Sequence, residues 1–154
     1  MAITIFDGEY AFLSNFYPSK FEWHGVVYPT VEHFFQAAKA DNQEDFEMVM
    51  KEPNPGGAKY AGRNVKLRSD WEEIKDDVML TALRCKFAIP ELRKKLLDTG
   101  THYLLEGNTW HDNYWGACKC PVCIYKRQYN NNQYNKLGIL LMKVREEIQE
   151  NSAN

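Results

Sequence analysis

Three polar side chains follow one another along the helix that the sequence predicts after Val31. Glu32, Gln36 and Lys39 stand at positions i, i+4 and i+7, so they share one edge of that helix. Glu32 falls in the first turn, where the positive end of the helix dipole favours an ionised carboxylate. Such a carboxylate can orient a water molecule or stabilise a developing cation. The same spacing also fits an ordinary solvated edge, on which Glu32 only complements the dipole.

A second group of candidate residues lies in the segment His111–Gly116. Asp112 is followed two residues later by the adjacent aromatic residues Tyr114 and Trp115. Aromatic faces can stack on a heterocycle while a carboxylate hydrogen-bonds a ribose hydroxyl or a ring nitrogen. The pattern fits equally well a small aromatic cluster that fixes a loop. Both interpretations stay open from the residues alone.

Basic side chains recur over residues 59–68, close to a glycine and a helix start. They are Lys59, Arg63, Lys66 and Arg68. Guanidinium and ammonium groups at this spacing could together bind a phosphate, although a solvated basic surface explains them as well. Trp71 follows shortly after and either lies beneath a ligand or packs in the core.

Three of the four cysteines crowd into one short segment, as Cys118, Cys120 and Cys123, while Cys85 lies in a helical pattern. This is not the disulfide framework of a small secreted protein. Zinc would need a fourth ligand, either His111 or the distant Cys85, and the usual paired spacing is absent. We therefore predict a reduced, aromatic-rich loop with no bound metal or cofactor.

The elements that must position these residues begin with short strands. An apolar run from Ile3 to Phe6 predicts one strand. Residues 21–23 face residues 26–28 across His24-Gly25, which is typical of a hairpin turn.

Helices dominate after Thr30, which has the residue type of an N-cap. Ser69 and Glu72 have the spacing of a capping box and predict a helix that continues to Cys85. The other predicted elements are a helix at 43–51, a helical turn near 59, a helix between 90 and 99, a strand at 103–106 and a last helix from about 135 to 150. Residues 107–133 form the one long irregular stretch, whose aromatic residues favour a functional loop.

Length and composition place all of this in one domain. The chain has 154 residues, of which 44% are hydrophobic, enough for one core without disulfides or metals. We predict a predominantly helical α+β fold over residues 1–150 and a disordered tail over 151–154. The net charge of -2 offers no long-range attraction for nucleic acid or an anionic membrane, so a phosphate must be bound by local basic residues. With no signal peptide or apolar span, we expect a cytoplasmic protein; the sequence leaves its oligomeric state open.

Taken in order, these segments resemble the NADAR family, which includes the YbiA-like N-glycosidases associated with riboflavin biosynthesis. The resemblance rests on Phe12–Pro18, Tyr28–Lys39, Ala61–Arg63, Trp71–Lys75 with Val78–Met79, Ala82–Phe87, Asp112–Gly116 and Asn135–Met142. After Gly116 many relatives carry a short glycine-rich stretch, whereas this chain carries a cysteine-rich segment. That difference bears mainly on which substrate the protein accepts.

The resemblance implies three catalytic residues, which are Glu32, Trp71 and Asp112. The residues that we expect to bind substrate are Asn15, Phe16, His33, Gln36, Lys39, Lys59, Gly62, Arg63, Tyr114, Trp115 and Asn135. The implied reaction is hydrolysis of the N-glycosidic bond in a phosphorylated ribosylamino-pyrimidine.

Three alternatives accompany that expectation. The first is removal of ADP-ribose from a modified nucleobase or protein, in which case an ADP-ribosylated nucleic acid would be a partner. The second is a non-catalytic module that binds ADP-ribose or NAD. The third is an interaction protein built around a cysteine-ligated zinc loop. None of the alternatives involves a membrane.

Overall fold

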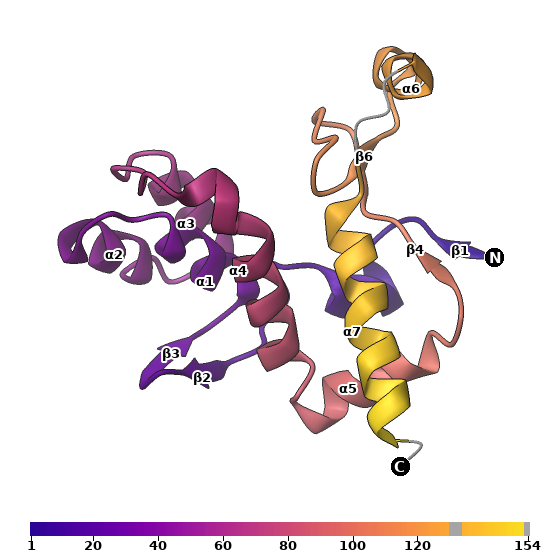
Figure 1. Ribbon diagram of the computed structural model, residues 1–154, viewed down its shortest axis with the longest axis horizontal. Helices are drawn as coiled ribbons and strands as arrows, with labels where there is room; N and C mark the ends of the chain where they lie inside the picture. The colour runs from indigo at the N-terminus through magenta and orange to yellow at the C-terminus, as the bar shows by residue number, and fades with distance from the viewer. Residues whose placement is uncertain (130–133, 153–154) are drawn as a thin grey trace. The chain divides into compact units, whose positions relative to one another are not determined.

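The computed structural model describes residues 1–129 and 134–152 (Figure 1). Most of this part of the chain is helical and its strands are short. The helices are η1 (Gly8–Leu13, a 3-10 helix), α1 (Val31–Ala38), α2 (Gln43–Met50), α3 (Pro55–Gly62), α4 (Trp71–Lys86), α5 (Pro90–Asp98), α6 (Pro121–Tyr129) and α7 (Lys136–Ser152). The strands are β1 (Ala2–Ile3), β2 (Phe21–Trp23), β3 (Val26–Tyr28), β4 (Tyr103–Leu104), β5 (Gly107–Asn108) and β6 (Ala117–Cys118). The predicted class, α+β and predominantly helical, is confirmed.

The chain forms two compact units. Unit 1 consists of Met1–Ser14 and Arg93–Asn154, and unit 2 consists of Asn15–Leu92. Of the three residues predicted to be catalytic, Glu32 and Trp71 belong to unit 2 and Asp112 belongs to unit 1.

The predicted hairpin is present in unit 2. β2 and β3 pair in antiparallel register, with Phe21 opposite Tyr28. His24 and Gly25 both have positive φ, 50° and 81°, as a two-residue type I′ turn requires. The hairpin packs on α1 through aromatic contacts, and the rings of Tyr28 and Phe34 are 4.8 Å apart.

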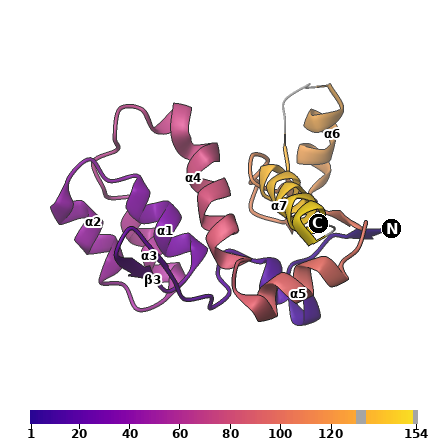
Figure 2. The same ribbon diagram turned by 60° about the horizontal axis from the view of Figure 1, so that its bottom comes forward.

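Helix α1 lies among the other helices of unit 2 (Figure 2). It contacts α2, α3 and α4, and every residue from Val31 to Ala37 is buried. The sequence predicted one apolar face and one polar edge, but neighbours cover the edge as well. Glu32 and Gln36 are therefore removed from water. Burial of this kind can shift the pKa of a carboxyl group.

The start of α4 differs from the prediction. Asp70, not Ser69, occupies the N-cap position, and its side chain makes no capping hydrogen bond. Its carboxylate instead accepts from Arg68, with Nε 2.6 Å from Oδ1. The predicted capping box is wrong because the helix begins at Trp71, which puts Asp70 in the N-cap position and leaves Ser69 outside it.

In unit 1, β1 pairs in parallel with β4, which places Ile3 opposite Leu104. Helix α7 packs on β4, and Leu104, Leu137 and Leu141 are fully buried there. Both strands are shorter than the runs 3–6 and 103–106 that the sequence indicated. A second parallel pair, β5 with β6, places Gly107 opposite Ala117.

Two expectations about unit 1 need correction. The segment 107–133, expected to be irregular, contains β5, β6 and the nine-residue helix α6; its last residues, 130–133, lie outside the described residues. The predicted tail 151–154 is wrong for Asn151 and Ser152, because α7 continues to Ser152 and Arg93 donates to its hydroxyl at 3.0 Å. Residues 153–154 lie outside the described part of the chain.

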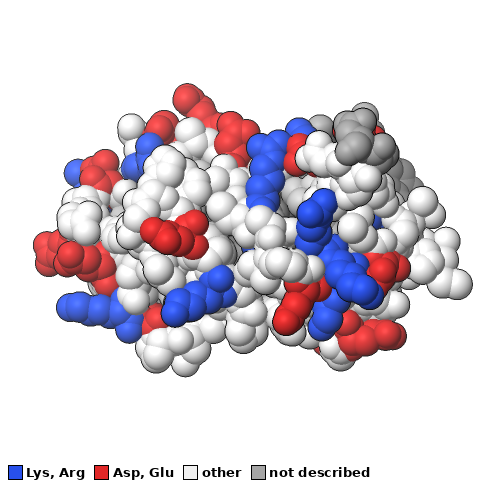
Figure 3. Space-filling model, turned by 90° about the horizontal axis from the view of Figure 1, so that it is seen from below, with Lys and Arg blue, Asp and Glu red and all other residues white. Residues whose placement is uncertain are grey.

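Acidic and basic side chains both appear on the face drawn in Figure 3, in keeping with the small net charge. Among the described residues, no helix is both long enough and apolar enough to cross a bilayer.

Candidate functional site

The Glu32 carboxylate is fixed by the hydrogen bonds at the start of α1. The Thr30 hydroxyl caps the helix by accepting from the His33 backbone N–H at 3.1 Å, and the Glu32 N–H donates to the Asn15 carbonyl at 3.1 Å. One turn later, Gln36 Nε2 donates to Glu32 Oε1 at 2.7 Å. Glu32 is only 7% exposed. The carboxylate is therefore both buried and directionally held.

Burial raises the pKa of Glu32 above its ordinary value. The hydrogen bond from Gln36 and the positive charges of Lys59 and Lys39 act in the opposite direction without cancelling it. The sequence predicted an ionised carboxylate because of the helix dipole, and burial works against that. A carboxyl whose pKa moves toward neutrality can both hold and release a proton during a reaction.

The charges of Lys39 and Lys59 act on this carboxylate, and the charge of Arg63 acts in turn on Lys39. Burial lowers the pKa of Lys39, Glu32 raises it, and the charges of Lys59 and Arg63 lower it further. Lys39 Nζ lies 5.4 Å from the centre of the Phe35 ring. The other two predicted cations are engaged elsewhere, because Lys66 pairs with Asp41 at 3.3 Å and Arg68 with Asp70. The basic cluster read from the sequence thus divides into two parts.

Two buried amide oxygens in unit 2 lack a hydrogen-bond donor among the described residues. They are Oδ1 of Asn15 and Oε1 of Gln36, on side chains that are 8% and 4% exposed. Their amide nitrogens are directed by neighbours, since Asn15 Nδ2 faces the Met79 sulfur at 3.6 Å and Gln36 Nε2 faces Glu32. Buried oxygens of this kind normally accept a hydrogen bond. They suit the hydroxyl groups of a ligand.

Gly62, at the end of α3, lies against the Gln36 amide. A Cβ at this position would stand 1.9 Å from Gln36 Oε1, far inside van der Waals contact. Only glycine leaves room for the Gln36 conformation that reaches Glu32. Gly62 therefore contributes to the candidate site by leaving space for Gln36, and not by a functional group of its own.

His33 and Trp71 are held within the protein. The His33 ring is fully buried, with Nε2 2.8 Å from the Glu52 carbonyl and Nδ1 2.8 Å from the Thr30 hydroxyl. The carbonyl can only accept, so the proton belongs on Nε2. Trp71 is 5% exposed and its ring meets Phe35 at 5.0 Å.

Other predicted residues of unit 2 lie nearer the surface. Phe16 is 42% exposed, and Lys59 Nζ lies 6.0 Å from the centre of its ring. Arg63 is exposed at the end of α3. A cavity of about 360 Å³ elsewhere in unit 2 is lined by Trp23, Phe34 and Phe46 among others. Arg68 of the predicted basic group lines it, but none of the residues expected to be catalytic or to bind substrate does.

In unit 1, Asp112 organises its own loop. Its Oδ1 accepts from the backbone N–H groups of Tyr114 and Trp115, both at 3.0 Å. The two rings stand nearly perpendicular, with centres 4.8 Å apart. Asn108, which the sequence did not single out, anchors the same loop by donating to the Asp112 carbonyl at 2.8 Å. Its position after a strand pattern was the only available signal.

Asn135 closes the other end of this region. It has a φ of 57°, and its side chain is fully buried. Oδ1 accepts from Glu106 N–H at 3.0 Å, while Nδ2 donates to the Leu104 carbonyl at 2.9 Å. Its backbone N–H donates to the Gly116 carbonyl at 3.0 Å. Through these contacts Asn135 fixes the backbone on both sides of the Asp112 loop.

The site thus combines a helical α+β chain with a buried glutamate at the start of α1 that accepts a hydrogen bond from Gln36. The model of the NADAR domain matches residues 5–149. The chain belongs to the NADAR family.

Relatives within and beyond bacteria show the same kinship. N-glycosidase YbiA of Shigella flexneri is 37% identical over 143 residues, which is 91% of this chain and 82% of that protein. The chloroplastic riboflavin biosynthesis protein PYRR of Zea mays is 35% identical over 135 residues, 79% of this chain but 20% of that larger protein.

A solved structure has the same fold. The NMR structure of the E. coli protein YbiA is 33% identical, covers 100% of this chain and 90% of its own, and superposes with a TM-score of 0.80. The expectation of a YbiA-like fold is confirmed, and the names of the relatives agree with the expectation of an N-glycosidase.

Proposed function

We propose that this protein is an N-glycosidase that hydrolyses the C–N bond between a phosphorylated ribose and an amine or base, with a ribosylamino-pyrimidine phosphate of the riboflavin-pathway type as substrate. The observation that carries the proposal is the Glu32 carboxyl group, buried, bound by Gln36 and surrounded by the charges of Lys39 and Lys59. The names of the YbiA and PYRR relatives support the reaction class and the pathway.

The reaction needs a group that stabilises the positive charge that develops on the sugar. As the C–N bond breaks, its electron pair leaves with nitrogen and the ribose becomes an oxocarbenium-like cation. Ionised Glu32 stabilises that cation while water adds to the anomeric carbon. The departing amine takes up one proton and the water gives up one, so the products are the free amine and ribose 5-phosphate. The raised pKa of Glu32 suits it to relay that proton.

The remaining side chains of unit 2 divide naturally between the two parts of ribose phosphate. Lys39, Lys59 and Arg63 supply the positive charge that a phosphate requires. The unpartnered oxygens of Asn15 and Gln36 accept from ribose hydroxyl groups.

His33 and Trp71 act as positioning residues. The first fixes the start of α1 through Thr30, and the second packs on Phe35 beneath Lys39, whose Nζ is 6.0 Å from the centre of the Trp71 ring.

For unit 1, the proposal assigns roles to the loop as the family resemblance implies. Asp112 assists the leaving nitrogen or orients ribose, and Tyr114 and Trp115 stack on the base. Asn135 holds the loop and does not touch the substrate, because its side chain is already bonded to Glu106 and Leu104.

The test compares two isosteric variants by their rates of ribose 5-phosphate release. Glu32→Gln keeps the size of the side chain but removes its charge and its basic oxygen, and turnover should fall by roughly 10²–10⁴-fold. Glu44→Gln, at an exposed position in the first turn of α2, is the matched control and should retain full activity. Near-normal turnover by Glu32→Gln would refute the assignment.

Parallel incubations with different substrates separate the substrate classes. Wild-type protein is incubated in parallel with the ribosylamino-pyrimidine phosphate and with ADP-ribosylated DNA and protein. Amine release from the first substrate alone supports the proposal. Release of ADP-ribose alone would move the activity to ADP-ribosyl hydrolysis. Thermal stabilisation by ADP-ribose with no bond cleaved, unchanged in Glu32→Gln, would indicate a binding module.

A further inference from the structure

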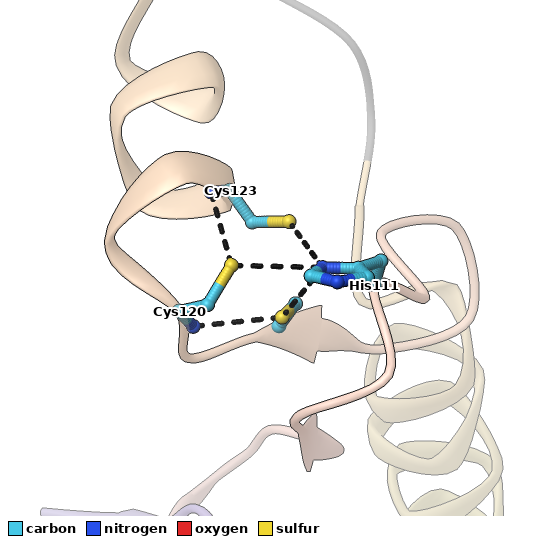
Figure 4. A group of neighbouring side chains, drawn as sticks. His111, Cys120 and Cys123 are labelled. Carbon is cyan, nitrogen blue, oxygen red and sulfur yellow. Dashed lines mark hydrogen bonds between the residues drawn. The ribbon is translucent and has the colours of Figure 1, made fainter.

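Four metal-binding side chains of unit 1 converge on one point. They are His111, Cys118, Cys120 and Cys123, whose ligand atoms all lie within 4.8 Å of one another. Figure 4 shows the sulfur atoms of Cys120 and Cys123 directed toward the ring of His111. None of these side chains has a place in the proposed glycosidase chemistry. The sequence favoured a loop without metal, since the paired cysteine spacing of common zinc motifs is absent.

The three nitrogen–sulfur distances within the cluster match a tetrahedral ligand shell. His111 Nδ1 lies 3.3 Å from the Cys123 sulfur and 3.6 Å from each of the sulfurs of Cys118 and Cys120. With Zn–N of about 2.0–2.1 Å and Zn–S of about 2.3 Å, tetrahedral geometry places nitrogen and sulfur roughly 3.6 Å apart. The three nitrogen–sulfur distances therefore agree with common ligation of one ion.

Hydrogen bonding alone does not account for this convergence. A neutral imidazole nitrogen offers one proton or one lone pair, so Nδ1 can make one such bond and not three. A cation shared by all four atoms satisfies the nitrogen and the three sulfurs together.

The surrounding backbone is arranged for thiolates. The N–H of Cys120 points to the Cys118 sulfur at 3.5 Å, and the N–H of Cys123 points to the Cys120 sulfur at 3.4 Å. Arg127 donates to the Cys118 carbonyl at 2.8 Å. One Zn²⁺ with three thiolates and a neutral imidazole carries a net charge of −1, and the Arg127 guanidinium provides the nearby positive charge.

We propose that His111, Cys118, Cys120 and Cys123 bind one structural zinc ion. Three thiolates and one imidazole favour zinc over the harder divalent cations. Four protein ligands fill the tetrahedral shell, so no position is left for water or substrate. The ion joins the start of α6, strand β6 and the residue next to Asp112, and so fixes the loop that carries Tyr114 and Trp115.

The first experiment measures metal content in the full-length protein, purified under reducing conditions, by elemental mass spectrometry. We expect one zinc ion per chain. Cys120→Ser and His111→Asn should each retain less than roughly a tenth of that zinc, because each removes one of four ligands. Cys85→Ser is the matched control, since Cys85 lies in α4 and outside the cluster, and it should bind zinc like the wild type.

Cobalt substitution tests the geometry independently of any activity. Co²⁺ added to metal-free protein should give the visible bands of tetrahedral cobalt and thiolate-to-metal charge transfer, and both should disappear in Cys120→Ser. Reduced protein that holds no zinc, even after incubation with Zn²⁺, would overturn the proposal. So would zinc retained in full by both ligand variants. Loss of glycosidase activity in Glu32→Gln, with zinc content unchanged, would keep the two proposals distinct.

Discussion

Replacing Gly62 with alanine should disturb Glu32 without touching it. The new Cβ would lie 1.9 Å from Gln36 Oε1, 2.8 Å from its Cδ and 3.1 Å from its Cβ. The amide group has to leave this position, and with it goes the 2.7 Å hydrogen bond that Gln36 donates to Glu32. The carboxylate would then stay buried with one donor fewer.

The size of the effect follows from two opposing terms. A hydrogen bond to a charged group contributes about 1.5–3 kcal/mol, and alanine in place of glycine in a helix returns about 1 kcal/mol. The net loss of stability should be roughly 0.5–2 kcal/mol, which for a chain of this size lowers Tm by roughly 1–8 °C. If Gln36 also holds Glu32 for catalysis, kcat/KM should fall by on the order of ten- to a hundredfold.

Gly56→Ala is the matched control on the same helix. A Cβ there meets only Asn54 Oδ1, at 3.8 Å, so stability should be unchanged or slightly higher and activity normal. A double-mutant cycle locates the cause, since in a Gln36→Ala background the cost of Gly62→Ala should largely vanish. The reasoning fails if Gly62→Ala melts and turns over like Gly56→Ala, or if its cost is the same in both backgrounds.

Three further outcomes are expected. Lys39→Met removes a charge that lowers the pKa of Glu32, so the acid limb of the kcat/KM profile should move to higher pH, whereas exposed Lys66→Met should leave it in place. Asp112→Asn preserves an oxygen for the turn to Tyr114 and Trp115 and should lose activity with little change in Tm, whereas Asp112→Ala should lose both. Burial lowers the pKa of Lys86 from 10.5 to about 7, so the folded state binds this proton less tightly than the unfolded chain. Lys86→Met should therefore be more stable than wild type at pH 7 by on the order of a few kcal/mol, and urea denaturation should show that difference shrinking as the pH rises toward 10.5.

The elements that the sequence predicted well are those whose signals are local. His24-Gly25 between two short apolar runs specifies a turn of positive φ, and the hairpin follows from it. Thr30 supplies the N-cap of α1 through its own hydroxyl. In both cases the residues that determine the structure are neighbours in the chain.

The features that escaped prediction depend on contacts made across longer distances or on competition for one side chain. Glu32 lies on what looked like a solvated edge, and only the packing of α1 among three other helices shows that it is buried. At the start of α4, the Asp70 carboxylate accepts a hydrogen bond from Arg68 and makes no capping hydrogen bond to the helix. The sequence could not decide whether His111 or Cys85 would be the fourth zinc ligand. In the structure it is His111 that lies beside the three sulfur atoms.

The position of the Glu32 carboxylate relative to bound ribose tests the central claim most directly. A crystal structure of the wild-type protein with ribose 5-phosphate should place a carboxylate oxygen of Glu32 within about 3.5 Å of the anomeric carbon. It should also show ribose hydroxyl groups donating to Asn15 Oδ1 and Gln36 Oε1. A sugar bound with its anomeric carbon out of reach of Glu32, and with both amide oxygens still lacking a donor, would contradict the account.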